Sequence, residues 1–457
     1  MTLAAADRPN FIVIFADDLG YGDLGVYGSD RNRTPRLDRM AAEGMRFTHF
    51  YATAPFCSPS RASLLTGRYP VRVGVPYVLF PTETTGLPPA EITVAEILAG
   101  RGYATAAIGK WHLGWPKPFR AQRHGFDFFY GLPYSNDMLK WEPDAQLRAQ
   151  HAFWHVPLLH DDEILEAPVN QHTLTKRYTE MAVRFIEQNR NRPFLLYFPH
   201  TFPHQPLYAS EDFEGRSPHG LYSDTIEEID WSVGQLLNAL ERLGLDESTL
   251  VVFTSDNGPS GGARRWPGRN GGGTTGGLRG RKGNTYEGGL RVPAIFRWPG
   301  RIAAGAVTSQ PASLLDLLPT LAGLAEAEVP ADRVIDGRSV ADLLLGEADR
   351  LDQEPFFYYF GVQLQAVRLG RWKLFPRRTE PPPQSSSLWY MHNPDLFERH
   401  HRLREQPELY DLEADAGETR DLASEHPAIV ERLDGLARRF DEGMQRDKRP
   451  PVYLDVR

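Results

Sequence analysis

The chain contains one cysteine, Cys57, which lies in the run Cys57-Ser58-Pro59-Ser60-Arg61. A free thiol is usually a small buried apolar side chain, but the residues around this one favour a chemical role. A serine and a proline at 58 and 59 are typical of a helix N-cap and a first helical residue, and Gly67 is typical of a helix end, so a short helix is predicted over Ser60–Thr66. Cys57 would then stand at a helix N-terminus, which favours an anion, with Arg61 on the same face. The sequence predicts a reactive side chain beside an anion-binding position.

Two pairs of oxygen-bearing side chains follow apolar runs of the chain. Asp17 and Asp18 follow the first run, and Asp256 and Asn257 follow a later one. An Asp-Asp pair alone is more often a cap or a turn, but two such pairs at strand ends favour a metal site. Three carboxylates and an amide suit a hard cation, with Ca²⁺ expected and Mg²⁺ as the alternative, and they suit zinc poorly.

Lys110 and His112 flank Trp111 just after the probable strand Tyr103–Ile108. In an extended segment the lysine and the histidine project to one side and the tryptophan to the other. A single such residue is usually a solvated or satisfied group. A pair at the carboxyl end of a strand is a candidate anion clamp and proton donor.

The elements that must position these residues alternate along the chain. Continuous apolar runs predict strands covered on both faces, and helical segments lie between them, so a doubly wound α/β sheet is expected. Ligands bind such sheets at the carboxyl ends of the strands, where the polar residues fall. The predicted strands are Phe11–Ala16, Tyr103–Ile108, Phe194–Phe198 and Leu250–Ser255, and the predicted helices are Leu37–Gly44, Thr93–Gly102, Tyr178–Arg190 and Ser223–Leu243.

The pattern changes after about residue 346. Short strands are predicted at Phe356–Phe360, Gln365–Leu369, Trp372–Phe375 and Glu408–Leu412, followed by an amphipathic helix over Pro427–Met444. We therefore expect a catalytic domain over residues 1–350 and a smaller α+β unit with an antiparallel sheet over residues 351–457.

Composition limits the class of protein. The 457 residues carry a net charge of -8, which argues against a nucleic-acid partner, and no apolar stretch is long enough to cross a bilayer. No export signal is visible, a single cysteine allows no internal disulfide, and only one glycosylation sequon occurs, Asn32-Arg33-Thr34. These features favour a bacterial, cytoplasmic enzyme, or a periplasmic one if a leader precedes this sequence.

The run from Cys57 to Arg68 closely resembles the signature of type I sulfatases, in which the cysteine is oxidised to formylglycine. The segments Asp17–Gly25, Gly109–Gly114 and Ser255–Gly258 also resemble that family, whose order they follow. The resemblance is greatest to the branch of arylsulfatase A and N-acetylgalactosamine-6-sulfatase. It implies an alkaline-phosphatase-like fold and a metal held by Asp17, Asp18, Asp256, Asn257 and the modified residue at 57.

The resemblance also assigns roles to other residues. It implies that Lys110 and His112 contact the sulfate, that His204 is a second active-site histidine, and that Lys282 is a further cation, although Arg281 replaces a glycine of the family pattern. His200 is a rival to His204, because both follow the same strand. Within the named branch, Ser135 would be an additional hydrogen-bond donor to the sulfate.

The implied activity is hydrolysis of a sulfate monoester to an alcohol or phenol and inorganic sulfate. Hydrated formylglycine would attack sulfur, His204 or Lys282 would assist the leaving oxygen, and His112 would help to release sulfate by removing a proton. A formylglycine-generating enzyme would be the partner in maturation. The alternatives are a phosphonate monoester or phosphodiester hydrolase with the same site, and an inactive anion-binding protein with unmodified Cys57.

The sequence does not identify the leaving group, aryl or sugar. Two loops, Asp137–Val169 and Pro376–His401, are expected to form the substrate subsites. Aromatic side chains there could stack on a ring, although ordinary packing explains each of them equally well. These side chains are Trp141, Trp154, His155, Trp389 and Tyr390.

Overall fold

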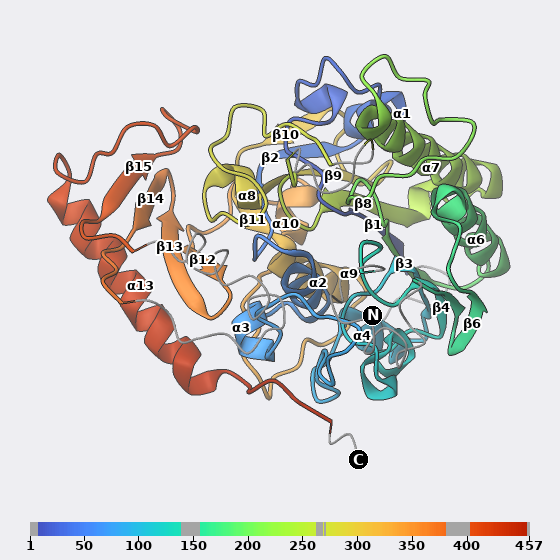
Figure 1. The fold of residues 1–457 in the computed structure, drawn as a ribbon, viewed down its shortest axis with the longest axis horizontal. Coiled ribbons are helices and arrows are strands. Elements are labelled where there is room, and N and C mark those ends of the chain that lie inside the picture. Colours follow the sequence, from blue (N-terminus) through green and yellow to red (C-terminus); the bar gives the residue numbers. More distant parts are fainter. Residues whose placement is uncertain (1–7, 139–155, 262–267, 269–270, 381–402, 455–457) are drawn as a thin grey trace.

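A mixed β-sheet forms the centre of the computed structural model, which describes residues 8–138, 156–261, 268, 271–380 and 403–454 (Figure 1). In these residues the sheet has eleven strands, ten of them in the order β10-β2-β9-β8-β1-β7-β3-β4-β5-β6, while β11 pairs with β2 beside that path. The strands are β1 (Asn10–Ala16), β2 (Met45–Tyr51), β3 (Ala104–Lys110), β4 (Phe128–Leu132), β5 (Leu158–His160), β6 (Glu163–Glu166), β7 (Phe194–Pro199), β8 (Thr249–Ser255), β9 (Arg291–Arg297), β10 (Ala306–Thr308) and β11 (Ala312–Ser313).

Five neighbouring strands at the centre of this sheet, β8, β1, β7, β3 and β4, are parallel. The strands β9 and β5 that flank them run antiparallel to their neighbours β8 and β4. The predicted α/β class with a largely parallel, mixed sheet is therefore confirmed. All five central strands end at one edge of the sheet, which is where such sheets bind ligands.

Both faces of the sheet are covered, as the continuous apolar runs predict. Along β1, Phe11, Val13 and Phe15 face one hydrophobic core, and Ile12 and Ile14 face the other. Helices α2, α4, α9 and α10 pack in the first core, and α1, α6 and α7 pack in the second. The helices are α1 (Pro35–Ala42), α2 (Cys57–Thr66), α3 (Pro70–Val73), α4 (Val94–Ala99), α6 (Leu174–Gln188), α7 (Leu221–Leu243), α8 (Glu287–Leu290), α9 (Leu317–Leu324), α10 (Ala341–Leu344) and α13 (Pro427–Asp447).

A second sheet is built from the C-terminal part of the chain, drawn in orange and red in Figure 1. It is antiparallel, with the order β12 (Phe356–Phe360), β13 (Gln363–Leu369), β14 (Trp372–Phe375) and β15 (Glu408–Asp411). Leu433 and Ala437 of α13 pack against one face, and the other face meets Tyr51 and Leu290 of the large sheet's unit. The predicted C-terminal antiparallel sheet is confirmed, whereas the domain boundary at residue 350 stays a prediction.

Several local predictions differ from the structure. The segment Asp137–Val169, expected to be a loop, contains strands β5 and β6. The helix after Cys57 begins at Cys57 itself, and Ser58 is not its N-cap, because its Oγ accepts a hydrogen bond from the Leu79 N–H at 3.1 Å. Lys110 is the last residue of β3 rather than a residue beyond it. Strands β2 and β9 were not predicted, since polar residues interrupt the first and arginines bound the second.

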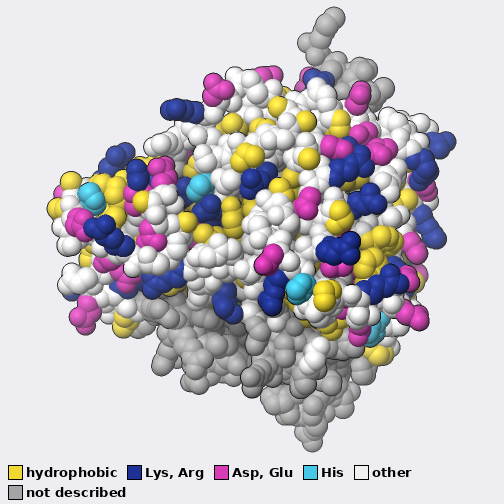
Figure 2. All heavy atoms as spheres, turned by 90° about the horizontal axis from the view of Figure 1, so that it is seen from above, with side chains coloured by type: hydrophobic (Ala, Val, Ile, Leu, Met, Phe, Trp, Pro, Cys, Tyr) yellow, Lys and Arg dark blue, Asp and Glu magenta, His cyan; other side chains and the backbone are white. Residues whose placement is uncertain are grey.

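Charged side chains of both signs are interspersed over the face of the molecule seen in Figure 2. None of the helices in the described part of the chain combines the length and the apolar character needed to cross a membrane.

Candidate active site

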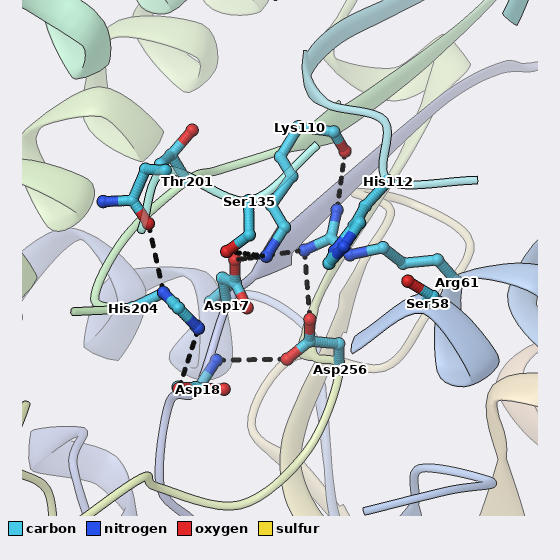
Figure 3. Close-up of polar contacts among 12 residues, drawn as sticks. Asp17, Asp18, Ser58, Arg61, Lys110, His112, Ser135, Thr201, His204 and Asp256 are labelled. Carbon is cyan, nitrogen blue, oxygen red and sulfur yellow. Dashed lines mark hydrogen bonds and ion pairs between the residues drawn. The ribbon is translucent and has the colours of Figure 1, made fainter. Parts of the chain in front are cut away.

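The carboxyl ends of the central parallel strands bring the predicted residues together (Figure 3). Asp17 and Asp18 follow β1, Asp256 follows β8, and Lys110 ends β3. The backbone ties these ends to one another, because the Asp256 N–H donates to Ala16 O at 3.2 Å and the Asp18 N–H donates to Asp256 Oδ1 at 3.1 Å. The site therefore depends on strand pairing more than on any single loop.

Each of the three carboxylates has a cation of its own. Lys110 Nζ lies 2.5 Å from Asp17 Oδ2, Lys282 Nζ lies 2.6 Å from Asp18 Oδ1, and Arg61 Nη2 lies 3.0 Å from Asp256 Oδ2. The guanidinium of Arg61 also donates to Lys110 O at 2.6 Å. Three negative and three positive charges cancel, so that a bound divalent cation would leave the site with two positive charges. Such a site attracts an anionic ester.

Cys57 is the first residue of α2 and is buried. Burial raises the pKa of its thiol, although Lys110 and Lys282 act in the opposite direction. A raised pKa disfavours the thiolate, which is the reactive form of cysteine. The unmodified thiol is therefore poorly suited to act as a nucleophile, despite its place at a helix N-terminus.

The oxygen atoms of the site fit a hard cation. Asp17 Oδ1, Asp18 Oδ2 and Asn257 Oδ1 are buried and have no hydrogen-bond partner among the described residues. Buried polar oxygens normally have a partner, and a cation such as Ca²⁺ would satisfy oxygens of this kind. Asp17, Asp18 and His204 each place one ligand-type atom within 4.8 Å of the others. The predicted ligands Asp17, Asp18 and Asn257 thus lie where a metal could be held.

Burial and neighbouring charges shift the pKa values of two carboxylates of the site in opposite directions. Burial and then the neighbouring Asp17 raise the pKa of Asp256 to about 7. Burial also acts to raise the pKa of Asp17, but Lys110, His204 and Arg61 outweigh it and hold that pKa well below its usual range. Two carboxylates this close repel each other when both are ionised, and a bound cation would keep both ionised.

The two rival histidines occupy different environments. His204 Nε2 lies 3.8 Å from Asp18 Oδ2, so its ring belongs to the acidic cluster. His200 is fully buried, packs against the Phe198 ring and has no hydrogen-bond partner for either nitrogen among the described residues. Burial alone lowers the pKa of His200 to about 3. The geometry favours His204 as the residue of the site.

His112 also lies in the site, and Figure 3 shows its ring beside the guanidinium of Arg61. Its Nε2 is 2.9 Å from Leu79 O, so this nitrogen carries the proton of a neutral ring. Nδ1 is then unprotonated, and it has no partner among the described residues. Burial, followed by Lys110 and Arg61, holds the pKa of His112 well below its usual range. The neutral ring therefore presents an unprotonated Nδ1.

The predicted residue Ser135 also lies in the site, where its Oγ accepts a hydrogen bond of 3.2 Å from Lys110 Nζ. Asn136 was missed, although it follows Ser135 beyond the carboxyl end of β4 and its Oδ1 lies 3.0 Å from His204 Nδ1. Its position after a parallel strand was the available signal. The loop aromatics proposed for substrate contacts, Trp141, Trp154, His155, Trp389 and Tyr390, lie outside the described residues.

Comparisons with known proteins decide the family. The Sulfatase family model matches residues 9–327, and a model described as the C-terminal region of aryl-sulfatase matches residues 351–450. The chain belongs to the sulfatase family. This sulfatase is 42% identical to arylsulfatase A of Homo sapiens, over 95% of this chain and 88% of that protein. It is 39% identical to steryl-sulfatase of Mus musculus, over 94% of this chain and 81% of that protein.

The sulfatase also resembles solved structures. The crystal structure of PsFucS1 sulfatase from Pseudoalteromonas sp. matches it with a TM-score of 0.83 and 26% identity, over 98% of this chain and 93% of that one. The expected alkaline-phosphatase-like sulfatase fold is confirmed. The chain is therefore an enzyme that hydrolyses sulfate esters, while the roles of its individual residues stay predictions.

Proposed function

We propose that this sulfatase uses formylglycine, formed from Cys57, as its nucleophile, and that Asp17, Asp18, Asp256, Asn257 and residue 57 hold a divalent cation, expected to be Ca²⁺. The observation that supports this most directly is the position of Cys57, at the start of α2 in a buried site with three carboxylates and three cations. When bound, the cation would polarise an oxygen of the nucleophile or the substrate.

The chain's own residues would orient the sulfate group and move protons. Lys110 and Lys282 each pair with one of the two aspartates that follow β1, so both ammonium groups can also face an anionic ester. Such fixed cations stabilise the charge that develops on the sulfate and leaving oxygens. His204 would donate a proton to the leaving oxygen, and His112 would accept one through Nδ1 when the sulfated enzyme releases its product.

The raised pKa of the Cys57 thiol supports modification over direct attack by sulfur. An oxygen nucleophile would not require a buried thiolate. An ordinary serine at this position could also attack, but its sulfate ester would lack the route of release that the second hydroxyl of an aldehyde hydrate provides. The chemistry thus requires the modified residue rather than a simple hydroxyl.

The substrate is proposed to be a sulfate monoester of a small molecule or a carbohydrate. Maturation would require a formylglycine-generating enzyme, and a bacterial cytoplasmic or periplasmic location remains a prediction. A screen of aryl and carbohydrate sulfates would identify the leaving group.

The test compares protein produced with and without a co-expressed formylglycine-generating enzyme. Intact and peptide mass spectrometry would report the modification at residue 57, and hydrolysis of an aryl sulfate and an aryl phosphonate would be measured side by side. We expect activity on the sulfate to rise in proportion to the modified fraction. Equal activity of unmodified protein would overturn the formylglycine proposal, and a preference for the phosphonate would identify a phosphonate hydrolase instead.

A further inference from the structure

The buried side-chain amide of Asn136 contacts the His204 ring and has no role in the reaction proposed above. The Nε2 of His204 points toward Asp18 (Figure 3), and Nδ1 of the same ring lies 3.0 Å from Asn136 Oδ1. Asn136 is fully buried, and His204 is 6% exposed. Since solvent does not reach this contact, the amide decides which ring nitrogen carries a proton.

The orientation of the Asn136 amide is fixed by a backbone group. Asn136 Nδ2 donates to Pro206 O at 3.0 Å and to Gln171 Oε1 at 2.9 Å. A carbonyl oxygen of the main chain can only accept a hydrogen bond, so the NH₂ group must face Pro206. The carbonyl oxygen of the amide therefore faces His204, and the Nδ1 of His204 must be the donor.

We infer that Asn136 is a positioning residue, which keeps the proton of His204 on Nδ1 and directs Nε2 to the reacting atoms. With Nδ1–H committed to Asn136, the proton that reaches a leaving oxygen is the one on Nε2. That proton passes from Nε2 to the oxygen as the bond between oxygen and sulfur breaks, and the ring returns to its neutral form with Nδ1–H intact. The inference rests on the proposed function.

Three segments of the chain build this contact. Asn136 follows β4, Gln171 precedes α6, and His204 lies beyond β7 in the segment that also contains Pro206. Gln171 Nε2 donates in turn to the main-chain Asn136 O at 3.3 Å, so two hydrogen bonds join these two residues. Partners of this kind orient active-site groups, and their loss typically costs about 10–100-fold where they support metal ligands.

The kinetic test uses matured enzyme supplied with Ca²⁺ and two esters, one with an activated aryl leaving group and one with an alkyl leaving group. Asn136→Leu removes the acceptor at nearly constant volume. General acid catalysis contributes about 10²-fold or more to the rate, and the variant should lose a part of this. We expect kcat for the alkyl ester to fall about 10-fold or more, and kcat for the aryl ester to change much less. Asn189→Leu is the matched control, because Asn189 is a buried amide at the end of α6 whose Nδ2 bonds to Phe185 O.

A double variant separates positioning from general damage. If Asn136 acts through His204, then Asn136→Leu in the His204→Ala background will slow the alkyl ester no further. Additive losses, or equal losses on both esters, would overturn the inference. A leaving-group effect confined to His200→Ala would also overturn it, since the acid role would then belong to His200.

A spectroscopic measurement tests the contact without turnover and without any substitution at Asn136. In ¹⁵N-histidine-labelled enzyme at about pH 8, where a ring of ordinary pKa is neutral, the signal assigned by its absence from His204→Ala should show a protonated Nδ1 and an unprotonated Nε2. The opposite tautomer would overturn the inference even if sulfatase activity is normal. If matured enzyme is no more active on sulfate esters than unmodified protein, the proposed function fails, and the catalytic part of the inference fails with it, while the tautomer still reports on the hydrogen bond.

Discussion

Residue 57 is expected to be essential for activity and to contribute little to stability. The side chain is small and buried at the start of α2, and alanine would remove only its sulfur atom. We therefore predict that Cys57→Ala lowers the melting temperature by no more than a few degrees, which corresponds to about 1 kcal/mol. The same variant should lose essentially all activity on an aryl sulfate. A variant that keeps a tenth of the wild-type rate would show that this residue does not supply the nucleophile.

Asp256 is one of the proposed metal ligands, and its Oδ2 lies 3.0 Å from Arg61 Nη2. We predict that Asp256→Ala weakens Ca²⁺ binding, measured by titration calorimetry, by about 10-fold or more and lowers activity in parallel, because a hard cation loses a charged ligand. Asp230→Ala is the control, since Asp230 is buried between α7 and the start of α1 and accepts from the Leu37 N–H at 2.8 Å. It should change stability and leave Ca²⁺ affinity unchanged. Full activity of the wild type after exhaustive chelation would exclude a catalytic metal.

At the scale of the element, β3 ends in Lys110, and it lies unusually close to its neighbour β7 at Gly109. Gly109 has a φ of 129°, and a Cβ there would lie 1.8 Å from Pro199 O of β7. We predict that Gly109→Ala destabilises the protein by about 3 kcal/mol or more, since backbone strain alone costs about 1–3 kcal/mol, and that it misplaces Lys110.

Gly102→Ala is the matched control for this prediction. Gly102 also has a positive φ, 84°, but a Cβ there would meet no atom within 4 Å. Urea unfolding should show a loss of only about 1–2 kcal/mol for this variant, the cost of a left-handed backbone for an L-residue. Equal losses for the two variants would show that the collision with β7 is relieved at little cost.

At the scale of the whole molecule, a buried charge cluster joins the two sheets. Lys373 Nζ of β14 lies 3.0 Å from Glu287 Oε1 of α8 and 2.9 Å from Glu418 Oε1, and all three side chains are fully buried. We predict that Lys373→Met destabilises the protein by about 3–5 kcal/mol, because it removes the cation nearest to two buried carboxylates. Arg371→Met, which removes a partly exposed pair with Asp411, should cost much less. Similar losses in urea unfolding would contradict this difference.

The same cluster predicts a dependence of stability on pH. Burial, reinforced by Glu287 and opposed by Lys373, raises the pKa of Glu418 from 4.5 to about 7. Between these values the unfolded chain releases the Glu418 proton and the folded chain keeps it, so the free energy of unfolding falls as the pH rises. Glu418→Gln has no proton to release here, so its free energy of unfolding lacks this fall. Relative to the wild type, its free energy of unfolding should increase by up to about 3 kcal/mol between pH 4.5 and pH 7. An equal difference between the two proteins at both pH values would contradict the prediction.

The sequence alone predicted the class of sheet and a set of candidate site residues. Asp17, Lys110 and Asp256 could be predicted because apolar runs mark buried parallel strands, and the carboxyl ends of such strands meet at one edge. Cys57 and Arg61 were found because a short helix places residues four apart on one face. These are local patterns, so no knowledge of distant contacts was needed.

Only the tertiary structure decided which partner each of these side chains takes. Lys282 and Asp18 are separated by 264 positions, and Arg61 and Asp256 by 195, so no local pattern couples them. The choice of His204 over His200 and the contact with Asn136 depend on the path of the chain beyond β7 and β4. That path is fixed by burial and hydrogen bonds among distant segments, and this is why one histidine meets the acidic cluster and the other is enclosed in the core.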